Sequence, residues 1–202
     1  EADVQFEKYL DIKFPTGLNF GDGSPEKKAM KEKAMKKFND WFTGKTKSGG
    51  NVTKKYEAVL SIKDNANSIA AAARLGQITE DFSDQLFTAE IPAEVRKSQI
   101  IDGYDVAQDK VDAYCDALTT AAEPLADQSL KAYGVCLSKS TELGWFSEWS
   151  KLCERELGQI AGAHHRRVVH VGQPEQMVGA LARLHVLEGH VVDRLAPGER
   201  VA

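Results

Sequence analysis

Five histidines could in principle bind a metal ion, because imidazole is the commonest metal ligand in proteins. All of them lie in the last quarter of the chain: His164, His165, His170, His185 and His190. No two have the i, i+4 spacing that places two imidazoles on one helical face, and no His-Glu-x-x-His motif is present. We therefore expect solvated histidines and no metal ligand. A metal-binding protein or enzyme that uses this His-rich C-terminal segment is the alternative.

The three cysteines, Cys115, Cys136 and Cys153, lack the paired two-residue spacing of a zinc site. Cys115 and Cys136 are equidistant from about position 125, where Glu123 and Pro124 predict that one helix ends and the next begins. If these two helices run back to back, a disulfide between Cys115 and Cys136 is geometrically feasible. Such a bond would imply an oxidising compartment such as the periplasm. Three buried, reduced thiols are the open alternative.

The other polar motifs match no catalytic or phosphate-binding pattern. There is no Gly-x-Ser-x-Gly elbow, and the glycine-rich stretches at residues 21–23 and 49–50 lack the lysine spacing of a phosphate loop. The acidic pairs Glu80-Asp81 and Asp109/Asp112 have the spacing of exposed helix faces. We expect no catalytic residue and no cofactor, and hence a protein that is not an enzyme.

Charge is distributed unevenly along a chain whose net charge is only -4. Residues 21–63 hold eleven lysines and five acidic residues, whereas residues 64–130 hold thirteen acidic and four basic ones. The first of these regions could track a phosphate backbone, but no arginine cluster or stacking platform accompanies its lysines. A solvated helix face is the favoured interpretation, and we expect no nucleic-acid partner. The lysines concerned are Lys27, Lys28, Lys31, Lys33, Lys36 and Lys37.

The elements that must position these residues are helices. Before residue 160 the apolar residues recur at three-and-four spacing, and no segment alternates long enough to be a strand. A Ser-Pro-Glu start signal precedes the second helix, which is expected to end in a flexible stretch at residues 43–50. Seven apolar stripes result, at about residues 2–12, 25–42, 52–63, 69–88, 104–118, 130–137 and 145–160. We predict an all-α fold of antiparallel helical hairpins, because the connections are short.

Within these hairpins the sequence repeats weakly. A shift of 77 residues places Tyr56 on Tyr133 and Leu60 on Leu137. Ala72, Leu75 and Gly76 also occupy positions where the first helix of a tetratricopeptide repeat wants a bulky residue, a leucine and a small residue. The small residue lets the facing helix approach closely, so we predict a stacked, tetratricopeptide-like solenoid with a concave binding surface.

Several segments resemble tetratricopeptide proteins of the myxobacterial envelope, including the lipoproteins of the adventurous gliding motility machinery or related deltaproteobacterial proteins. These segments are residues 9–18 (YLDIKFPTGL), 54–64 (KKYEAVLSIKD), 70–77 (AAAARLGQ), 82–92 (FSDQLFTAEIP) and 133–157 with its WFSEWSKLCE core. The resemblance covers roughly residues 1–160. It implies a scaffold without catalytic activity in a multiprotein machine, located in the periplasm or on the periplasmic face of the outer membrane.

Composition changes abruptly near residue 160. All five histidines and six of the eight arginines lie after Glu154, where the chain has no lysine and no aromatic residue. We therefore expect a tetratricopeptide-like helical repeat domain at residues 1–160 and a distinct His/Arg-rich tail at residues 161–202. Two hypotheses for the tail stay open: an altered-frame segment of a GC-rich gene, or an amphipathic helix that docks through Met177, Leu181, Leu184 and Leu187.

Together these features predict a non-catalytic protein–protein interaction scaffold in a cell-envelope assembly, with gliding motility as the implied setting. No apolar stretch approaches the roughly 20 residues that a membrane-spanning helix needs. Because the chain begins at Glu1, we expect it to be a C-terminal fragment, and the resemblance implies an upstream lipid anchor. The expected partners are envelope proteins.

Overall fold

The computed structural model describes residues 1–21, 25–62 and 64–171, and these residues form mostly helix. The all-α prediction is therefore confirmed for them. In chain order the elements are α1 (Ala2–Leu10), η1 (Pro25–Lys27), α2 (Lys28–Ser61), α3 (Asn65–Phe87), α4 (Ala93–Arg96), β1 (Ile100–Ile101), β2 (Tyr104–Asp105), α5 (Ala107–Glu142) and α6 (Glu148–Val171).

The chain divides into two compact units, Glu1–Gly162 and Ala163–Ala202. The boundary lies close to the change in composition near residue 160. The first unit contains every element from α1 to the N-terminal part of α6. Residues 172–202, which include the expected docking leucines, lie outside the described residues.

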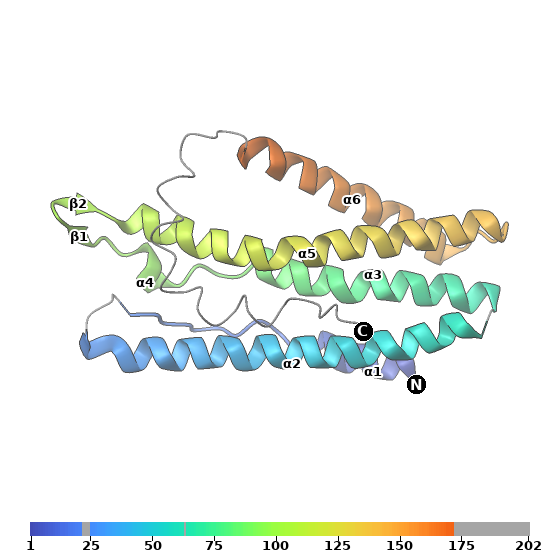
Figure 1. Cartoon of the computed structure of the whole chain (residues 1–202), viewed down its shortest axis with the longest axis horizontal. Helices are drawn as coiled ribbons and strands as arrows, with labels where there is room; N and C mark the ends of the chain where they lie inside the picture. The colour runs from blue at the N-terminus through green and yellow to red at the C-terminus, as the bar shows by residue number, and fades with distance from the viewer. Residues whose placement is uncertain (22–24, 63, 172–202) are drawn as a thin grey trace, which may run out of the picture. The chain divides into compact units, whose positions relative to one another are not determined.

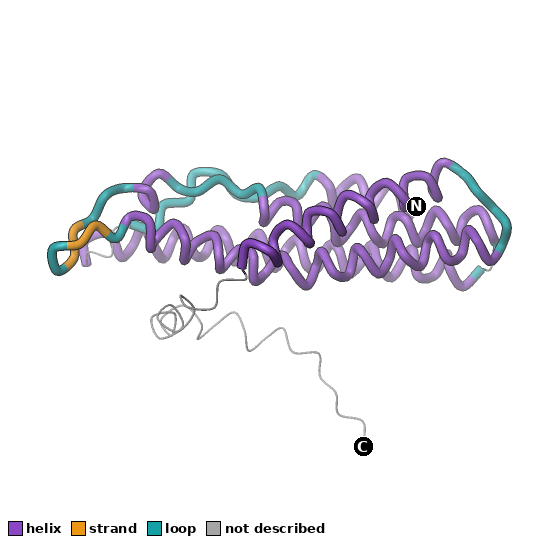
Figure 2. The backbone as a smooth tube through the Cα atoms, turned by 90° about the horizontal axis from the view of Figure 1, so that it is seen from above, coloured by secondary structure: helices purple, strands orange, loops and turns teal. Residues whose placement is uncertain are grey.

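In the first unit the long helices α2, α3 and α5 lie side by side, and each runs antiparallel to the next (Figure 1). The short helix α1 lies along α2, and the extended segment after α1 runs back beside α2, where the amine of Lys37 donates a hydrogen bond to the carbonyl of Thr16. Figure 2 shows the β1–β2 hairpin beyond the start of α5, at the opposite end from the α2–α3 and α5–α6 turns.

Helix α2 is continuous through residues 43–50, so the flexible linker expected there is wrong. One buried stripe runs along the whole helix and contains Trp41, Lys45, Gly49, Val52 and Tyr56. Lys45 and Gly49 in this stripe interrupt the apolar pattern in the sequence without interrupting the helix. Packing of this face against α1 and α3 outweighs the cost of about 1 kcal/mol for each glycine in a helix interior.

Helix α5 likewise passes through Pro124, where the sequence predicted a helix boundary. Pro124 is exposed, so the backbone carbonyl that loses its partner at this point faces water. The buried stripe continues on the other side of the helix, through Leu118, Ala122, Ala126, Ser129 and Tyr133. Burial of this face keeps the helix intact on both sides of the proline.

Helix α3 is central, because it contributes to all three clusters of buried apolar residues. With α1 and α2 it encloses a cluster around Phe6, Tyr9 and Val52. With α2 and α5 it forms a second, aromatic cluster around Trp41 and Phe82. The third cluster lies between α3, α5 and α6 and consists of Ile69, Ala72, Ala73, Tyr133, Cys136 and Cys153.

Helix α5 packs closely against α3 at Gly76. The ring of Tyr133 lies directly against this glycine, and a β-carbon added there would be only 2.6 Å from a ring carbon. Gly76 therefore leaves room for a side chain of the neighbouring helix, and the tetratricopeptide stacking inferred from this residue stays a prediction. The side chain that fills the space comes from α5.

Candidate functional site

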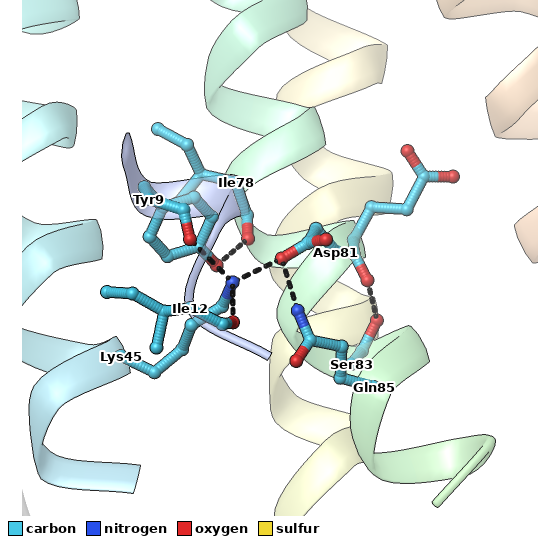
Figure 3. A network of polar contacts seen from close by, with 8 residues as sticks. Tyr9, Ile12, Lys45, Ile78, Asp81, Ser83 and Gln85 are labelled. Carbon is cyan, nitrogen blue, oxygen red and sulfur yellow. Dashed lines mark hydrogen bonds and ion pairs between the residues drawn. The ribbon is translucent and has the colours of Figure 1, made fainter. Parts of the chain in front are cut away.

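The side chain of Lys45 is fully buried between α1, α2 and α3. Its amine donates hydrogen bonds to the backbone carbonyls of Tyr9 (2.9 Å) and Ile12 (3.0 Å) and lies 2.6 Å from Oδ2 of Asp81. Figure 3 shows these three contacts converging on the amine. The Tyr9 hydroxyl donates to the carbonyl of Ile78 at 2.6 Å.

This network has the residue types of an acid–base site but not its accessibility. Burial lowers the pKa of Lys45, opposed by the adjacent carboxylate of Asp81, and burial raises the pKa of Tyr9. All three ammonium protons of Lys45 have an acceptor within the protein, so none is left for a substrate. The arrangement ties α1 and α2 to α3, which is a structural role.

A second polar cluster lies on the other side of α3, where Glu80 meets Tyr133 of α5 and Glu156 of α6. The Tyr133 hydroxyl donates a hydrogen bond to Oε2 of Glu80. Arg155 donates from Nε (2.8 Å) and Nη2 (2.5 Å) to Oε1 of Glu156. The side chain of Glu156 is only 15% exposed, which is unusual for a carboxylate on a surface helix.

Burial raises the pKa of Glu80 to about 7, and the carboxylates of Glu156 and Asp84 add to this shift, while the hydrogen bond from Tyr133 acts in the opposite direction. Burial and the contact with Glu80 also raise the pKa of Tyr133, which therefore stays a donor. The sequence interpretation of Glu80-Asp81 as an exposed helix face is wrong: the two neighbouring carboxylates point to different partner helices.

The disulfide in the structure joins Cys136 to Cys153, with a Cα–Cα distance of 6.3 Å. Cys115 is a free, half-buried thiol, so the feasible Cys115–Cys136 pairing is corrected. The reason is the continuity of α5: residues 115 and 136 lie on one helix, about 32 Å apart along its axis. A disulfide spans Cα atoms less than about 7 Å apart. The observed bond instead joins α5 to α6.

The histidines on which the metal-binding alternative depends all lie outside the described side chains. His164, His165 and His170 lie in the part of α6 whose side chains are not described, and His185 and His190 fall outside the described residues. Among the described side chains, no three His, Cys, Asp or Glu residues are close enough together to hold a metal ion.

A pocket of about 530 Å³ opens between residues 13–19 and the segment that follows α3. Its lining includes Gln85, whose Oε1 is buried without a hydrogen-bond partner, and the acidic side chains of Glu90 and Glu94. Lys45 and Asp81 do not line it, so the buried amine cannot be reached from this pocket.

The β1–β2 hairpin exposes three large apolar side chains. Ile100 is 64% exposed, Ile101 48% and Tyr104 76%. The hairpin pairs Ile101 with Tyr104 and turns through Asp102 and Gly103, both of which have positive φ. That is the geometry of a two-residue type I′ turn, for which Asp-Gly is a preferred pair. The helical stripe predicted to begin at Tyr104 is therefore wrong at its start, where the Asp-Gly pair between Ile101 and Tyr104 is the sequence signal for the hairpin.

Asp105 fixes this hairpin to the start of α5. Its carboxylate accepts hydrogen bonds from the Ser98 hydroxyl (2.7 Å) and from the backbone N–H groups of Gln99 (3.1 Å) and Ala107 (3.0 Å). These hydrogen bonds lower the pKa of Asp105. The amine of Lys110 also donates to the carbonyl of Lys97 at 2.9 Å. The exposed apolar side chains of the hairpin are therefore held by a backbone that these hydrogen bonds attach to α5.

Aromatic side chains are also exposed at the α5–α6 turn, where Trp145 is 50% and Phe146 73% exposed. Trp149, four residues beyond Trp145, instead packs in the third cluster, with the guanidinium of Arg74 at 4.9 Å from its ring centroid. The four-residue spacing of the two tryptophans predicts that both lie on one buried helical face, but only Trp149 does, because Trp145 precedes the start of α6 at Glu148.

None of the helices within the described residues has the length and apolar character needed to cross a bilayer. Comparison with protein-family models, curated proteins and solved structures gives no match to this chain. The case for a function therefore depends on the geometry of the described residues.

Proposed function

We propose that this chain is a non-catalytic scaffold that binds a partner protein through the β1–β2 hairpin. The observation that carries the proposal is the exposure of Ile100, Ile101 and Tyr104 on a hairpin held in place by the hydrogen bonds of Asp105. Large apolar and aromatic side chains presented on a rigid support are the usual anchors of protein interfaces. Tyrosine is especially favourable, because it buries a large ring and keeps a polar end.

The interior polar groups support a structural role. Lys45 is saturated by two backbone carbonyls and a carboxylate, and it does not line the described pocket. Glu80 and Tyr133 are hydrogen-bonded to each other in the seam between helices. Burial shifts the pKa values of all three side chains, and all three are engaged in joining helices.

The proposed location is the periplasm or the periplasmic face of the outer membrane. The Cys136–Cys153 disulfide supports an oxidising compartment. The family resemblance supplies the more specific part of the proposal, which is a cell-envelope assembly with gliding motility as its setting and an upstream lipid anchor.

The tetratricopeptide character of the fold belongs to the same proposal. It is supported by the 77-residue shift, which relates the α2–α3 hairpin to the α5–α6 hairpin. Tyr56 and Tyr133, which the shift pairs, are both buried, and each hydroxyl donates to a carboxylate, of Asp3 and Glu80 respectively. The units would have unusually long helices, because α2 alone is 34 residues, the usual length of a whole repeat.

The test is affinity capture from a cell-envelope extract with the full chain as bait. The double variant Ile101→Thr/Tyr104→Thr removes two of the apolar anchors, and threonine keeps the preference of both positions for a strand. We expect at least a tenfold loss of the captured envelope protein, because anchor residues of this type commonly contribute 2 kcal/mol or more, about 30-fold, to binding. The matched control, Val4→Thr with Val135→Thr, removes exposed apolar groups elsewhere.

The control should capture as much partner as the unmodified chain. Recovery of no envelope protein by the unmodified chain would contradict the scaffold function itself. Equal recovery by the hairpin variant would leave a scaffold but remove the hairpin as its binding surface.

A further inference from the structure

The carboxyl groups of Glu80 on α3 and Glu156 on α6 lie within hydrogen-bonding distance of each other, in a seam where most of the packed side chains are apolar. On α6, Glu156 lies on the same face as Trp149, Cys153 and Ile160, all of which pack in the third cluster. On α3, Glu80 lies one turn beyond Gly76, on the side that faces Tyr133. The buried face of an amphipathic helix normally carries apolar residues. An apolar pair at these two positions would stabilise the docking of α6 without the cost of removing two charges from water.

We propose that Glu80 and Glu156 form a pH-sensitive latch, which holds α6 against α3 and α5 while the two carboxyl groups share a proton and loosens it once both are charged. Like charges in a seam of restricted solvation repel strongly, and a shared proton converts that repulsion into a hydrogen bond. The latch is a property of the helix seam and does not depend on the proposed hairpin interface.

The charged and titratable groups around Glu80 define which carboxyl holds the proton. From α5 the Tyr133 hydroxyl donates to Glu80, and on α3 itself Asp84 adds a further negative charge. On α6 Arg155 places its guanidinium on Glu156. The positive charge of the Arg155 guanidinium therefore lies beside Glu156 and not beside Glu80. Glu80 is the carboxyl group that takes up the proton, and its O–H donates a hydrogen bond to Glu156.

The sign of the pH dependence follows from linkage. The pKa of Glu80 is about 7 with α6 docked, against 4.5 for an unperturbed glutamate. The docked state thus binds more protons than the released state between these values, so docking weakens as pH rises from about 4.5 to 7 and then levels off. One linked proton changes the docking constant by up to about tenfold per pH unit in this window.

The disulfide limits how far α6 can move. Cys153 lies one turn before Glu156 and is bonded to Cys136, so the helix stays attached to α5 when the carboxylates repel. Release would uncover the part of the third cluster against which Leu157 and Ile160 pack. The latch would thus control the exposure of an apolar surface without separating the two helices.

The test is amide hydrogen exchange of the intact, oxidised chain at pH 5.5 to 8, corrected for the intrinsic pH dependence of exchange. Residues 148–160 report docking, and α2 is the internal reference. We expect the protection of residues 148–160 to fall at least tenfold between pH 5.5 and 8, relative to α2. Glu80→Gln keeps a neutral side chain at every pH and should abolish this fall, and Glu156→Gln should do the same by removing the opposing charge.

Glu154→Gln is the matched control, because it removes a charge from the exposed face of the same helix; it should behave like the unmodified chain. Unchanged relative protection between pH 5.5 and 8 in the unmodified chain would overturn the latch. So would a full pH-dependent fall in both Gln variants. If Glu80→Gln does not fold, the profile of Glu156→Gln decides by itself.

Discussion

Lys45 shows how a single polar residue can organise three helices. Its amine meets backbone carbonyls from the end of α1, a carboxylate from α3 and the face of the Tyr9 ring, 3.8 Å from the ring centroid. An ammonium group removed from water is costly unless it is fully hydrogen-bonded, and here it is. Because the carbonyl acceptors are backbone atoms, the contact fixes the path of the chain after α1 as well as the position of α2.

Lys45→Met is expected to lower the free energy of unfolding by about 3 kcal/mol, because it removes the amine's hydrogen bonds and leaves the carboxylate of Asp81 without its opposite charge. The double variant Lys45→Met/Asp81→Leu should recover part of this loss, since it removes the unpaired charge. Urea unfolding measures both. Lys47→Met, on the exposed side of α2, is the control and should change stability by less than about 0.5 kcal/mol. An equally small effect of Lys45→Met would contradict the role assigned to the buried amine.

Helix α3 packs against each of the other long helices, α2, α5 and α6. Glu80 and Asp81 are adjacent in sequence, yet Asp81 meets α2 through Lys45 and Glu80 meets α5 and α6. Consecutive residues on a helix point about 100° apart, which lets one acidic dipeptide serve both sides. Small residues complete the arrangement, because Ala71, Ala72 and Ala73 are buried and Gly76 lies against Tyr133.

Gly76→Ala should destabilise the fold by about 1–3 kcal/mol, because the new methyl group overlaps the Tyr133 ring and the ring is fully buried. Gly134→Ala, on the neighbouring helix, meets no atom within 4 Å and should instead stabilise the fold by up to about 1 kcal/mol through helix propensity. Thermal or urea unfolding distinguishes the two signs. A stabilising Gly76→Ala would show that α5 does not approach α3 this closely.

The elements also show which features a sequence can predict. Helical periodicity indicated the all-α class and placed the turn between α2 and α3 near Lys63, but it broke α2 and α5 at residues 43–50 and at Pro124. The glycines of α2 and the proline of α5 are local helix-breaking signals. Helix continuity depends instead on burial of one face against neighbouring helices, and in α2 that face contains Lys45 and Gly49. The Glu80–Glu156 contact joins two helices that are far apart in the sequence. It could not be predicted without knowing that α6 packs against α3.

For the whole molecule, the division at Gly162 has a direct consequence for folding. Among the described side chains, the buried members of the three apolar clusters extend from Phe6 to Cys153, and the partly buried residues packed against them extend to Ile160. The disulfide and both polar networks also lie before Gly162. The first unit therefore contains a complete core of its own, as an independently folding domain requires.

A chain ending at Gly162 should then unfold in a single cooperative transition, because every cluster that stabilises the first unit is retained. Circular dichroism during urea unfolding, compared with the full chain, measures this. A shallow, non-cooperative loss of helix in the shortened chain would mean that residues 163–202 are needed for the fold. A cooperative transition would instead separate the structural role of the first unit from any role of the histidines, because all five of them lie beyond Gly162. Partner capture by the shortened chain would then assign the proposed interface to the first unit alone.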